Sequence, residues 1–175
     1  MKYKDAIKQS IEELVKDERV IFLGYNINYG SRAYGTLANI PQSRCLETPL
    51  AENLMTSLAT GMSLQGYRPV VFFERHDFVL VALDSIVNHI DKIEKLSHGL
   101  YQTPVIIRAV VGSNKPIDPG LQHTQDFTKT LKEIVSFPVI ELKDSKQIIE
   151  EYSKVLKRNC PVMFIERKDW YEKEC

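Results

Sequence analysis

Apolar residues along the chain follow two kinds of pattern, short continuous runs and helical spacing. The run "RVIFLG" (residues 19–24) ends at a glycine, and similar runs recur as "PVVFF", "PVIIRAVV", "FPVIEL" and "PVMFIE". Continuous rather than alternating runs are typical of strands that are buried on both faces of a parallel sheet. Together with a short strand expected at "RCLE", they predict a sheet of about six strands.

Segments with helical spacing lie between these runs. Ile7, Ile11 and Leu14 define the apolar face of an N-terminal helix, and further helices are expected over residues 50–65, 78–96, 124–134 and 145–156. Strands that alternate with helices favour a three-layer α/β/α domain with a mostly parallel sheet. We find no repeat and no low-complexity linker, so residues 1–175 are expected to form a single domain.

The segment 50–65 is unusual because it carries no charge between Asn53 and Gln65, whereas Glu52 stands at its start. Thr48 is the predicted N-cap, and we expect the helix to be packed on most sides. Burial would raise the pKa of a carboxyl group at this position and would suit it to proton transfer. An acid in the first turn of a helix is also favoured by the helix dipole alone, so a purely structural role remains the alternative.

Ligands of parallel α/β sheets bind beyond the carboxyl ends of the strands. The segments expected there are Gly24–Asn28, Glu47–Glu52, Glu74–Phe78 and Gly112–His123. They include several polar and aromatic side chains suited to binding a small molecule.

Composition excludes several classes of protein. Lysine plus arginine and aspartate plus glutamate are both 23, which argues against a general nucleic-acid binder or a binder of anionic membranes, although a local basic pocket for a phosphate is compatible with it. The three cysteines, Cys45, Cys160 and Cys175, are too widely spaced for a disulfide framework or a zinc site. No signal-peptide pattern or membrane-spanning run is present, so we expect a cytoplasmic protein.

Several motifs taken together resemble a known family. The stretch "ETPLAENLMTSLATGMSLQGYRPVVFFERHDFVLVALDSIVNHIDKI", with "DERVIFLG", "TPVIIRAVVG", "HTQDF" and "CPVMFIER", is similar to the pyrimidine-binding domain of transketolase-like thiamine diphosphate enzymes. The closest likeness is to the beta chain of the first component of the 2-oxo acid dehydrogenases. The resemblance covers nearly the whole chain and implies the thiamine diphosphate-binding fold.

The resemblance also implies roles for individual residues. Glu52 matches the glutamate that hydrogen-bonds N1′ of the cofactor's aminopyrimidine, and Phe78 matches the aromatic residue that packs against that ring. His123 matches a histidine that faces the substrate, and Asn26 and His76 stand at positions expected beside the cofactor. From the residues alone, Phe78 could equally be a core residue and His123 a surface histidine.

Some features of the family pattern are missing or changed. We find no Gly-Asp-Gly motif, so the resemblance implies that Mg²⁺ and the cofactor's diphosphate are held by a partner subunit, and no metal ligand is assigned to this chain. The C-terminal domain of the dehydrogenase beta chain is also not found. Tyr25 and Asn26 replace two acids of the dehydrogenase pattern, and Arg75 and His76 replace an aromatic residue and an alanine.

The function expected from the resemblance is that of the pyrimidine-side subunit of a split transketolase-like enzyme acting on a ketose and an aldose. The alternatives are a beta-type subunit of a 2-oxo acid decarboxylase or dehydrogenase, and a non-catalytic regulatory module of the same fold. An α₂β₂ heterotetramer is expected, assembled partly through the helix 78–96, whose apolar residues include Val79, Leu83, Ile86, Val87 and Ile90.

Overall fold

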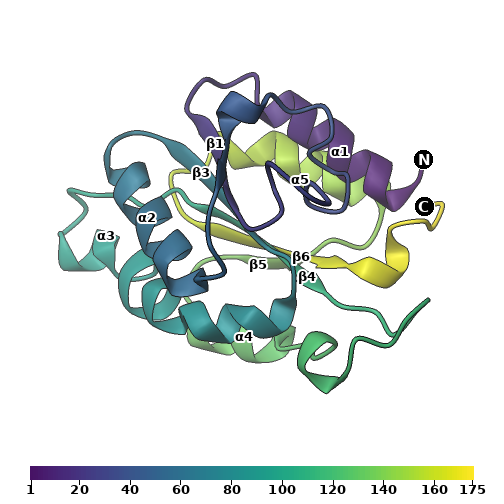
Figure 1. The fold of residues 1–175 in the computed structure, drawn as a ribbon. Helices are drawn as coiled ribbons and strands as arrows, with labels where there is room; N and C mark the ends of the chain where they lie inside the picture. The colour runs from purple at the N-terminus through teal and green to yellow at the C-terminus, as the bar shows by residue number, and fades with distance from the viewer.

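The computed structural model describes residues 1–175 and contains one six-stranded sheet in which all neighbouring strands are parallel (Figure 1). The strand order is β2-β1-β3-β4-β6-β5. The strands are β1 (Val20–Gly24), β2 (Cys45–Glu47), β3 (Arg68–Phe73), β4 (Ile106–Val111), β5 (Val139–Glu141) and β6 (Val162–Arg167). The predicted α/β class with about six mostly parallel strands is confirmed.

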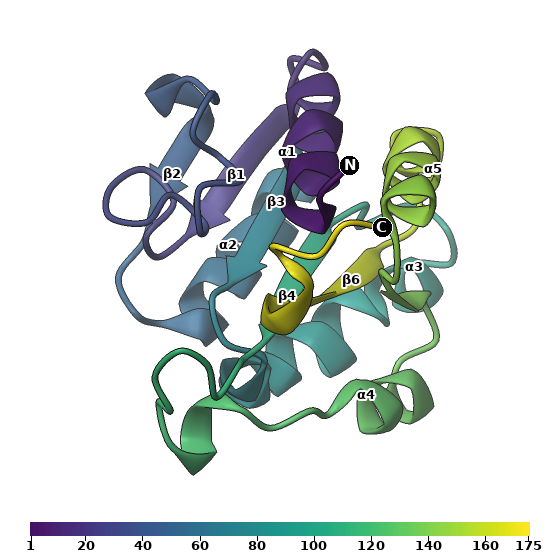
Figure 2. The ribbon, with the colours of Figure 1, turned by 90° about the vertical axis from the view of Figure 1, so that its right-hand side faces the viewer.

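Helices cover both faces of the sheet. Helices α1 (Tyr3–Leu14) and α5 (Ser145–Val155) lie side by side on one face, and α2 (Glu52–Leu64) and α4 (Thr128–Ile134) lie on the other (Figures 1 and 2). Successive strand residues point to opposite faces, so Val70 joins the core under α1 and α5, whereas Val71 joins the core over α2. This burial on both faces explains why the sequences of the strands are continuous apolar runs. None of the helices combines the length and the apolar character that crossing a bilayer would require.

The segment between β3 and β4 differs from the predicted helix 78–96. It forms a 3₁₀ helix η2 (His76–Ala82), a π helix η3 (Ser85–Ile90) and a short α-helix α3 (Ile93–Leu96). The Ser85 hydroxyl lies 2.7 Å from the Ser57 hydroxyl of α2, and the Thr103 hydroxyl donates to the Ile90 carbonyl over 2.8 Å. Both ends of η3 thus form hydrogen bonds with other elements, and the backbone between them is π-helical rather than α-helical.

Two predicted helix starts are also shifted. Helix α2 begins at Glu52 with Ala51 as its N-cap, so the prediction of Thr48 as N-cap was wrong. The Thr48 amide donates to the Gly24 carbonyl over 2.9 Å, which extends the pairing of β2 with β1 beyond the last strand residue. Helix α4 begins at Thr128 rather than near residue 124, because the Thr128 amide is bonded to the Asp126 carboxylate over 2.9 Å.

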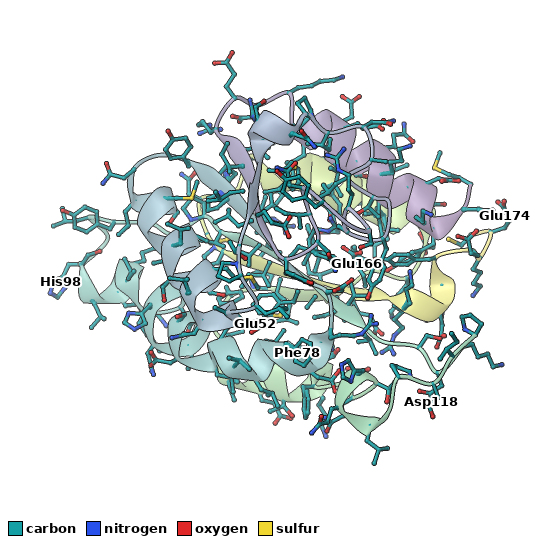
Figure 3. All side chains as sticks on the ribbon, viewed as in Figure 1. Glu52, Phe78, His98, Asp118, Glu166 and Glu174 are labelled. Carbon is teal, nitrogen blue, oxygen red and sulfur yellow. The ribbon has the colours of Figure 1, made fainter.

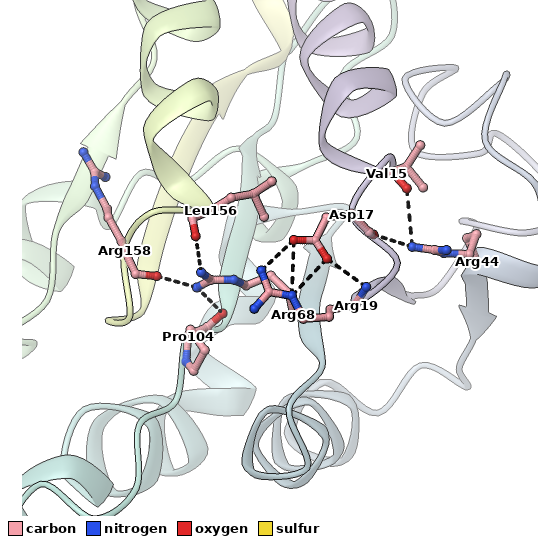
Figure 4. A network of polar contacts seen from close by, with 8 residues as sticks. All are labelled: Val15, Asp17, Arg19, Arg44, Arg68, Pro104, Leu156 and Arg158. Carbon is pink, nitrogen blue, oxygen red and sulfur yellow. Dashed lines mark hydrogen bonds and ion pairs between the residues drawn. The ribbon is translucent and has the colours of Figure 1, made fainter.

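Two arginines at the amino end of the sheet donate hydrogen bonds to carbonyls that follow the helices α1 and α5. Arg68, at the start of β3, donates to the carbonyls of Leu156 over 2.8 Å and Arg158 over 2.6 Å, just after α5 (Figure 4). Arg44 donates to the Asp17 carbonyl over 2.6 Å, just after α1. Cations near helix C-termini satisfy carbonyls that have no partner within the helix. At the amino end of the sheet, these arginines therefore have a structural role, since their hydrogen bonds hold the ends of α1 and α5 in place.

A buried ion pair joins the central strands β4 and β6. Arg108 Nε lies 2.6 Å from Glu166 Oε1, both side chains are fully buried, and the Tyr171 hydroxyl donates to Glu166 over 2.6 Å. Glu166 is fully buried, and its label lies apart from those of Glu52 and Phe78 (Figure 3). The pair belongs to the core under α1 and α5 because Arg108 lies over the Phe72 ring of that core.

Candidate functional site

A pocket opens between the carboxyl ends of β1 and β3, where the direction of the strand connections reverses. From β1 the chain continues to β2 on one side, whereas from β3 it continues to β4 on the other. The pocket is lined by Tyr25 just after β1, by Phe72 and Phe73 of β3 and by Glu74 just after it. The segment before α2 and the first turn of α2 contribute Pro49, Leu50, Ala51, Glu52 and Met55, and η2 contributes Phe78. Such reversal points are the usual ligand sites of open parallel sheets.

Glu52 and Phe78 face this pocket from two different elements (Figure 3). Glu52 is the first residue of α2, where the amide groups of the first turn have no partner within the helix. Both side chains are half-buried in the chain alone. The structure therefore brings a carboxylate and an aromatic ring to one pocket, and their roles toward a cofactor stay predictions.

His123 lies next to Phe78. The two rings meet edge to face, with centroids 5.4 Å apart and an angle of 80° between their planes. The backbone of His123 passes so close to Gly112 that a Cβ there would lie 1.8 Å from the His123 carbonyl oxygen. His123 Nδ1 is buried without a hydrogen-bond partner. Glycine at position 112 thus allows the loop to hold His123 against the pocket's aromatic wall.

Asn26 reaches the pocket through a neighbour. Its side-chain amide donates to Glu74 Oε2 over 3.2 Å, and Glu74 lines the pocket. Asn26 has a φ of 57°, in the left-handed region that asparagine tolerates better than most residues. The predicted contact of Asn26 with a ligand stays a prediction, and its observed bond orients Glu74.

Sequence reasoning gave Glu47 no individual role, although the segment that it opens was expected at the ligand edge. The Glu47 carboxylate accepts the backbone amides of Asn26 and Asn28 over 2.6 and 2.7 Å, and those of Ile27 and Tyr29 over 3.1 and 3.4 Å. One carboxylate therefore fixes the loop after β1. A glutamate ending a short strand carries no distinctive sequence signal for this task.

His76 does not line the pocket. It is fully buried, its ring meets Phe127 edge to face, and Nδ1 lies 3.8 Å from Asp126 Oδ1. Burial lowers the pKa of His76 more than the nearby Asp126 and Asp77 carboxylates raise it, so the ring is held neutral. His76 is the first residue of η2 and is buried rather than exposed in the pocket, and its contact with a cofactor stays a prediction.

Helix α2 is less enclosed than the sequence predicted. Leu54 and Leu58 are 57% and 40% exposed, because only the side of α2 that faces the sheet and η3 is covered. The pocket itself has an internal volume of about 20 Å³, which is room for little more than one water molecule. A larger ligand would therefore contact this pocket on one side only.

No group of three or more His, Cys, Asp and Glu side chains lies close enough together to bind a metal ion.

Comparisons with known proteins show the family of the chain. A family model described as "Transketolase, pyrimidine binding domain" matches residues 1–173. The chain is 26% identical over 173 residues to the pyruvate dehydrogenase E1 component subunit beta of Rickettsia conorii, covering 96% of this chain and 52% of that protein. It is 27% identical to the human mitochondrial subunit beta, covering 96% of this chain and 48% of that protein. The chain thus spans about half the length of these curated relatives.

Two solved structures share the fold. A structure titled "Split gene transketolase, inactive beta4 tetramer" aligns with a TM-score of 0.72 at 18% identity, over 96% of this chain and 52% of that one. Transketolase from Campylobacter jejuni aligns with a TM-score of 0.77 at 11% identity, over 95% of this chain and 26% of that one. Since the family model covers almost every residue, the chain belongs to the transketolase pyrimidine-binding domain family.

Proposed function

We propose that the chain is the pyrimidine-side subunit of a split thiamine diphosphate-dependent, transketolase-like enzyme. The observation that carries this proposal is the meeting of Glu52 and Phe78 in one pocket at the reversal point of the sheet. Family membership supports it, and the structural neighbour whose title names a split-gene transketolase supports the two-subunit arrangement. The enzyme would cleave or transfer a C–C bond next to a carbonyl group.

The residues of the pocket fit the pyrimidine half of the cofactor. An aminopyrimidine is a flat ring with a weakly basic nitrogen, which needs one proton-sharing group and an apolar surface. Glu52 supplies the first, and Phe78, Leu50 and Met55 supply the second. The diphosphate and Mg²⁺ would be bound by the partner subunit, as expected from the absence of the Gly-Asp-Gly motif.

Within this proposal, Glu52, Phe78 and His123 each have a defined role. Bound thiamine diphosphate supplies a carbon nucleophile at C2 of its thiazolium ring. The Glu52 carboxyl would share a proton with the ring nitrogen N1′ and so control the proton affinity of the amino group on the opposite side of that ring. Phe78 would pack against the pyrimidine, and His123, in contact with Phe78, would present an imidazole from the loop after β4.

A second candidate is a beta-type subunit of a 2-oxo acid decarboxylase or dehydrogenase. The names of the curated relatives favour it, since both are pyruvate dehydrogenase E1 beta subunits. Tyr25 and Asn26 replace two acids of the dehydrogenase pattern, and Arg75 replaces an aromatic residue. These replacements favour the transketolase-like enzyme, because Tyr25 lines the pocket and Arg75 directly follows Glu74, which also lines it. The two reactions share the proton transfer assigned to Glu52.

The test is Glu52→Gln, which keeps the shape of the side chain but cannot carry the proton. Hydrogen–deuterium exchange at C2 of thiamine diphosphate, measured with the chain reconstituted with its diphosphate-binding subunit, should slow by about 100-fold or more. Glu133→Gln, a change of an exposed acid in α4, is the matched control and should leave the rate unchanged. An undiminished exchange rate in Glu52→Gln would remove the catalytic role and with it the proposal.

A further inference from the structure

The 3₁₀ helix η2 contacts the loop between β4 and α4 through the rings of two of its residues. The His76 ring meets the Phe127 ring edge to face, with centroids 6.2 Å apart. The Phe78 ring meets the His123 ring in the same way, with centroids 5.4 Å apart. Asp77, which stands between His76 and Phe78 in the sequence, makes a third contact with the same loop.

This third contact is a pair of hydrogen bonds between Asp77 and Gln125, the residue midway between the two contacted rings of the loop. Asp77 Oδ1 accepts the backbone amide of Gln125 over 3.2 Å and its side-chain amide over 3.0 Å. Hydrogen bonds to a carboxylate are stronger than those between neutral groups and depend more on direction than ring contacts do. Asp77 is therefore the contact that fixes the register of the loop on η2.

No other hydrogen bond joins the segment 113–125 to the rest of the chain. Its remaining bonds run within the segment, for example from the His123 amide to the Gly120 carbonyl over 3.1 Å. Its large apolar side chains add little packing, since Ile117 and Leu121 are 80% and 87% exposed. The hydrogen bonds that hold this loop against the fold thus converge on one carboxylate.

Asp77 is well placed for this task because it is itself firmly held. It is 6% exposed, and Val79 and Ala82 of the same helix are fully buried in the core over α2. The two bonds from Gln125 are the only hydrogen bonds that its carboxylate accepts, and Oδ2 is buried without a partner. A buried carboxylate without donors is costly. Opening the loop would remove both donors, so Asp77 favours the closed loop.

We propose that Asp77 is a positioning residue, which holds the loop 113–125 against η2 and thereby keeps the His123 imidazole in contact with Phe78. The proposal rests on the proposed function and deepens it, since it states how the chain fixes the imidazole of the site. Asp77 does not line the pocket with Glu52, so it acts through His123 and not by contact with cofactor or substrate. The contact requires an acceptor oxygen at position 77 rather than a negative charge.

The contact is tested on the full chain alone by NMR. The ring current of Phe78 should shift the imidazole protons of His123, and Phe78→Leu gives the size of this shift. Asp77→Ala should remove it and should speed hydrogen exchange of the Gln125 amide by about tenfold, the scale of one charge-assisted hydrogen bond. Asp77→Asn should keep both signals close to those of the wild type, because its amide oxygen can accept the same two bonds.

Two further variants make this test specific. Asp84→Ala removes an exposed acid that is bonded to Asn88, and as the matched control it should change neither signal. Gln125→Ala removes one of the two donors from the exposed side and should reduce the His123 shift even if Asp77→Ala lowers overall stability. A His123 shift that is unchanged in both Asp77→Ala and Gln125→Ala, or that is lost equally in Asp77→Asn, would overturn the proposal.

The consequence for turnover is tested on the chain reconstituted with its diphosphate-binding subunit. His123→Ala should lower kcat for a ketose by about tenfold or more, and Asp77→Ala should lower it by up to the same factor. In the double variant, Asp77→Ala should add no further loss, since both changes act through one imidazole. Asp84→Ala should leave kcat unchanged.

Additive losses in the double variant, or wild-type turnover in His123→Ala, would show that Asp77 does not act through His123. The NMR experiment needs neither cofactor nor partner subunit. Failure of the Asp77 contact and failure of the proposed function therefore give different results.

Discussion

His76 is buried without a hydrogen-bond partner on either ring nitrogen. Burial is the dominant influence on its pKa, which lies below the ordinary value of 6.5. The unfolded chain therefore takes up a proton on His76 as the pH falls through about 6.5, whereas the folded chain does so only at lower pH. More protons are bound in the unfolded state in this window, so the free energy of unfolding must decrease as the pH decreases.

The prediction is a flatter pH dependence of stability in His76→Leu. Between pH 7 and pH 5 the wild type should lose up to about 1.4 kcal/mol per pH unit from this group, below its unfolded pKa. His76→Leu should lack that part of the slope, since leucine occupies the site without a titrating group. Denaturant unfolding at a series of pH values measures it, with His89→Gln at an exposed histidine as the control. Equal slopes in His76→Leu and the wild type would show that His76 titrates alike in both states.

At the scale of single residues, the sequence indicated candidate side chains for the site, but it did not indicate what surrounds each of them in the fold. Glu52 and Phe78 were assigned from a resemblance, and the structure places both in one pocket. His76 was expected beside the cofactor from the same resemblance, but successive residues of the 3₁₀ helix η2 point in different directions, and the His76 side chain is fully buried. The bonds between Asp77 and Gln125 join residues 48 positions apart, and no local pattern in the sequence indicates that they meet.

Among the elements, α1, α5 and the strands were predictable because each buries one continuous face or run. The region 78–96 was not, because its irregular helices depend on bonds to α2 and to Thr103, which are distant in sequence. The anchoring of α5 by Arg68 is a similar long-range feature. A positive charge at the start of an apolar strand gives no sign that it will bind carbonyls 88 and 90 residues away.

Arg68→Met should loosen the end of α5. Arg68 is 3% exposed and donates to the carbonyls of Leu156 and Arg158. Since the lost donor is charged and both carbonyls lose a hydrogen-bond partner, the free energy of unfolding should fall by about 2–3 kcal/mol. Native-state hydrogen exchange should also become faster in the last turn of α5 than in α2. The control is Arg19→Met, whose side chain pairs with Asp17 near the surface and should contribute little. A loss no larger than in the control would contradict the anchoring role.

At the scale of the whole molecule, the elements that line the pocket with Glu52 also carry several exposed apolar residues. Leu50, Leu54, Leu58, Leu80 and Val81 are each at least 40% exposed, and they come from α2, the segment before it and η2. By contrast, Val79, Ile86 and Ile90, which the sequence analysis expected at an interface, are buried against α2 and the sheet. The proposed contact surface therefore consists of the outer face of α2 together with Leu80 and Val81 of η2, and not of the side of residues 78–96 that carries Val79, Ile86 and Ile90. Exposed apolar patches of this kind usually mark an interface.

The last prediction is that this surface assembles the chain with its diphosphate-binding subunit into an α₂β₂ heterotetramer. Because the surface adjoins the pocket with Glu52, a partner seated on it would also enclose the cofactor's pyrimidine. Light scattering on the co-expressed subunits should give the mass of two copies of each. Leu54→Glu combined with Leu58→Glu should reduce the assembly to smaller species and abolish turnover, since burying two charges in an apolar contact costs several kcal/mol. Ile149→Glu, a change of an exposed apolar residue on α5 across the sheet, should leave both the mass and the activity intact. A fully active one-to-one heterodimer, or an unchanged heterotetramer in the double variant, would show that the outer face of α2 does not hold the enzyme together.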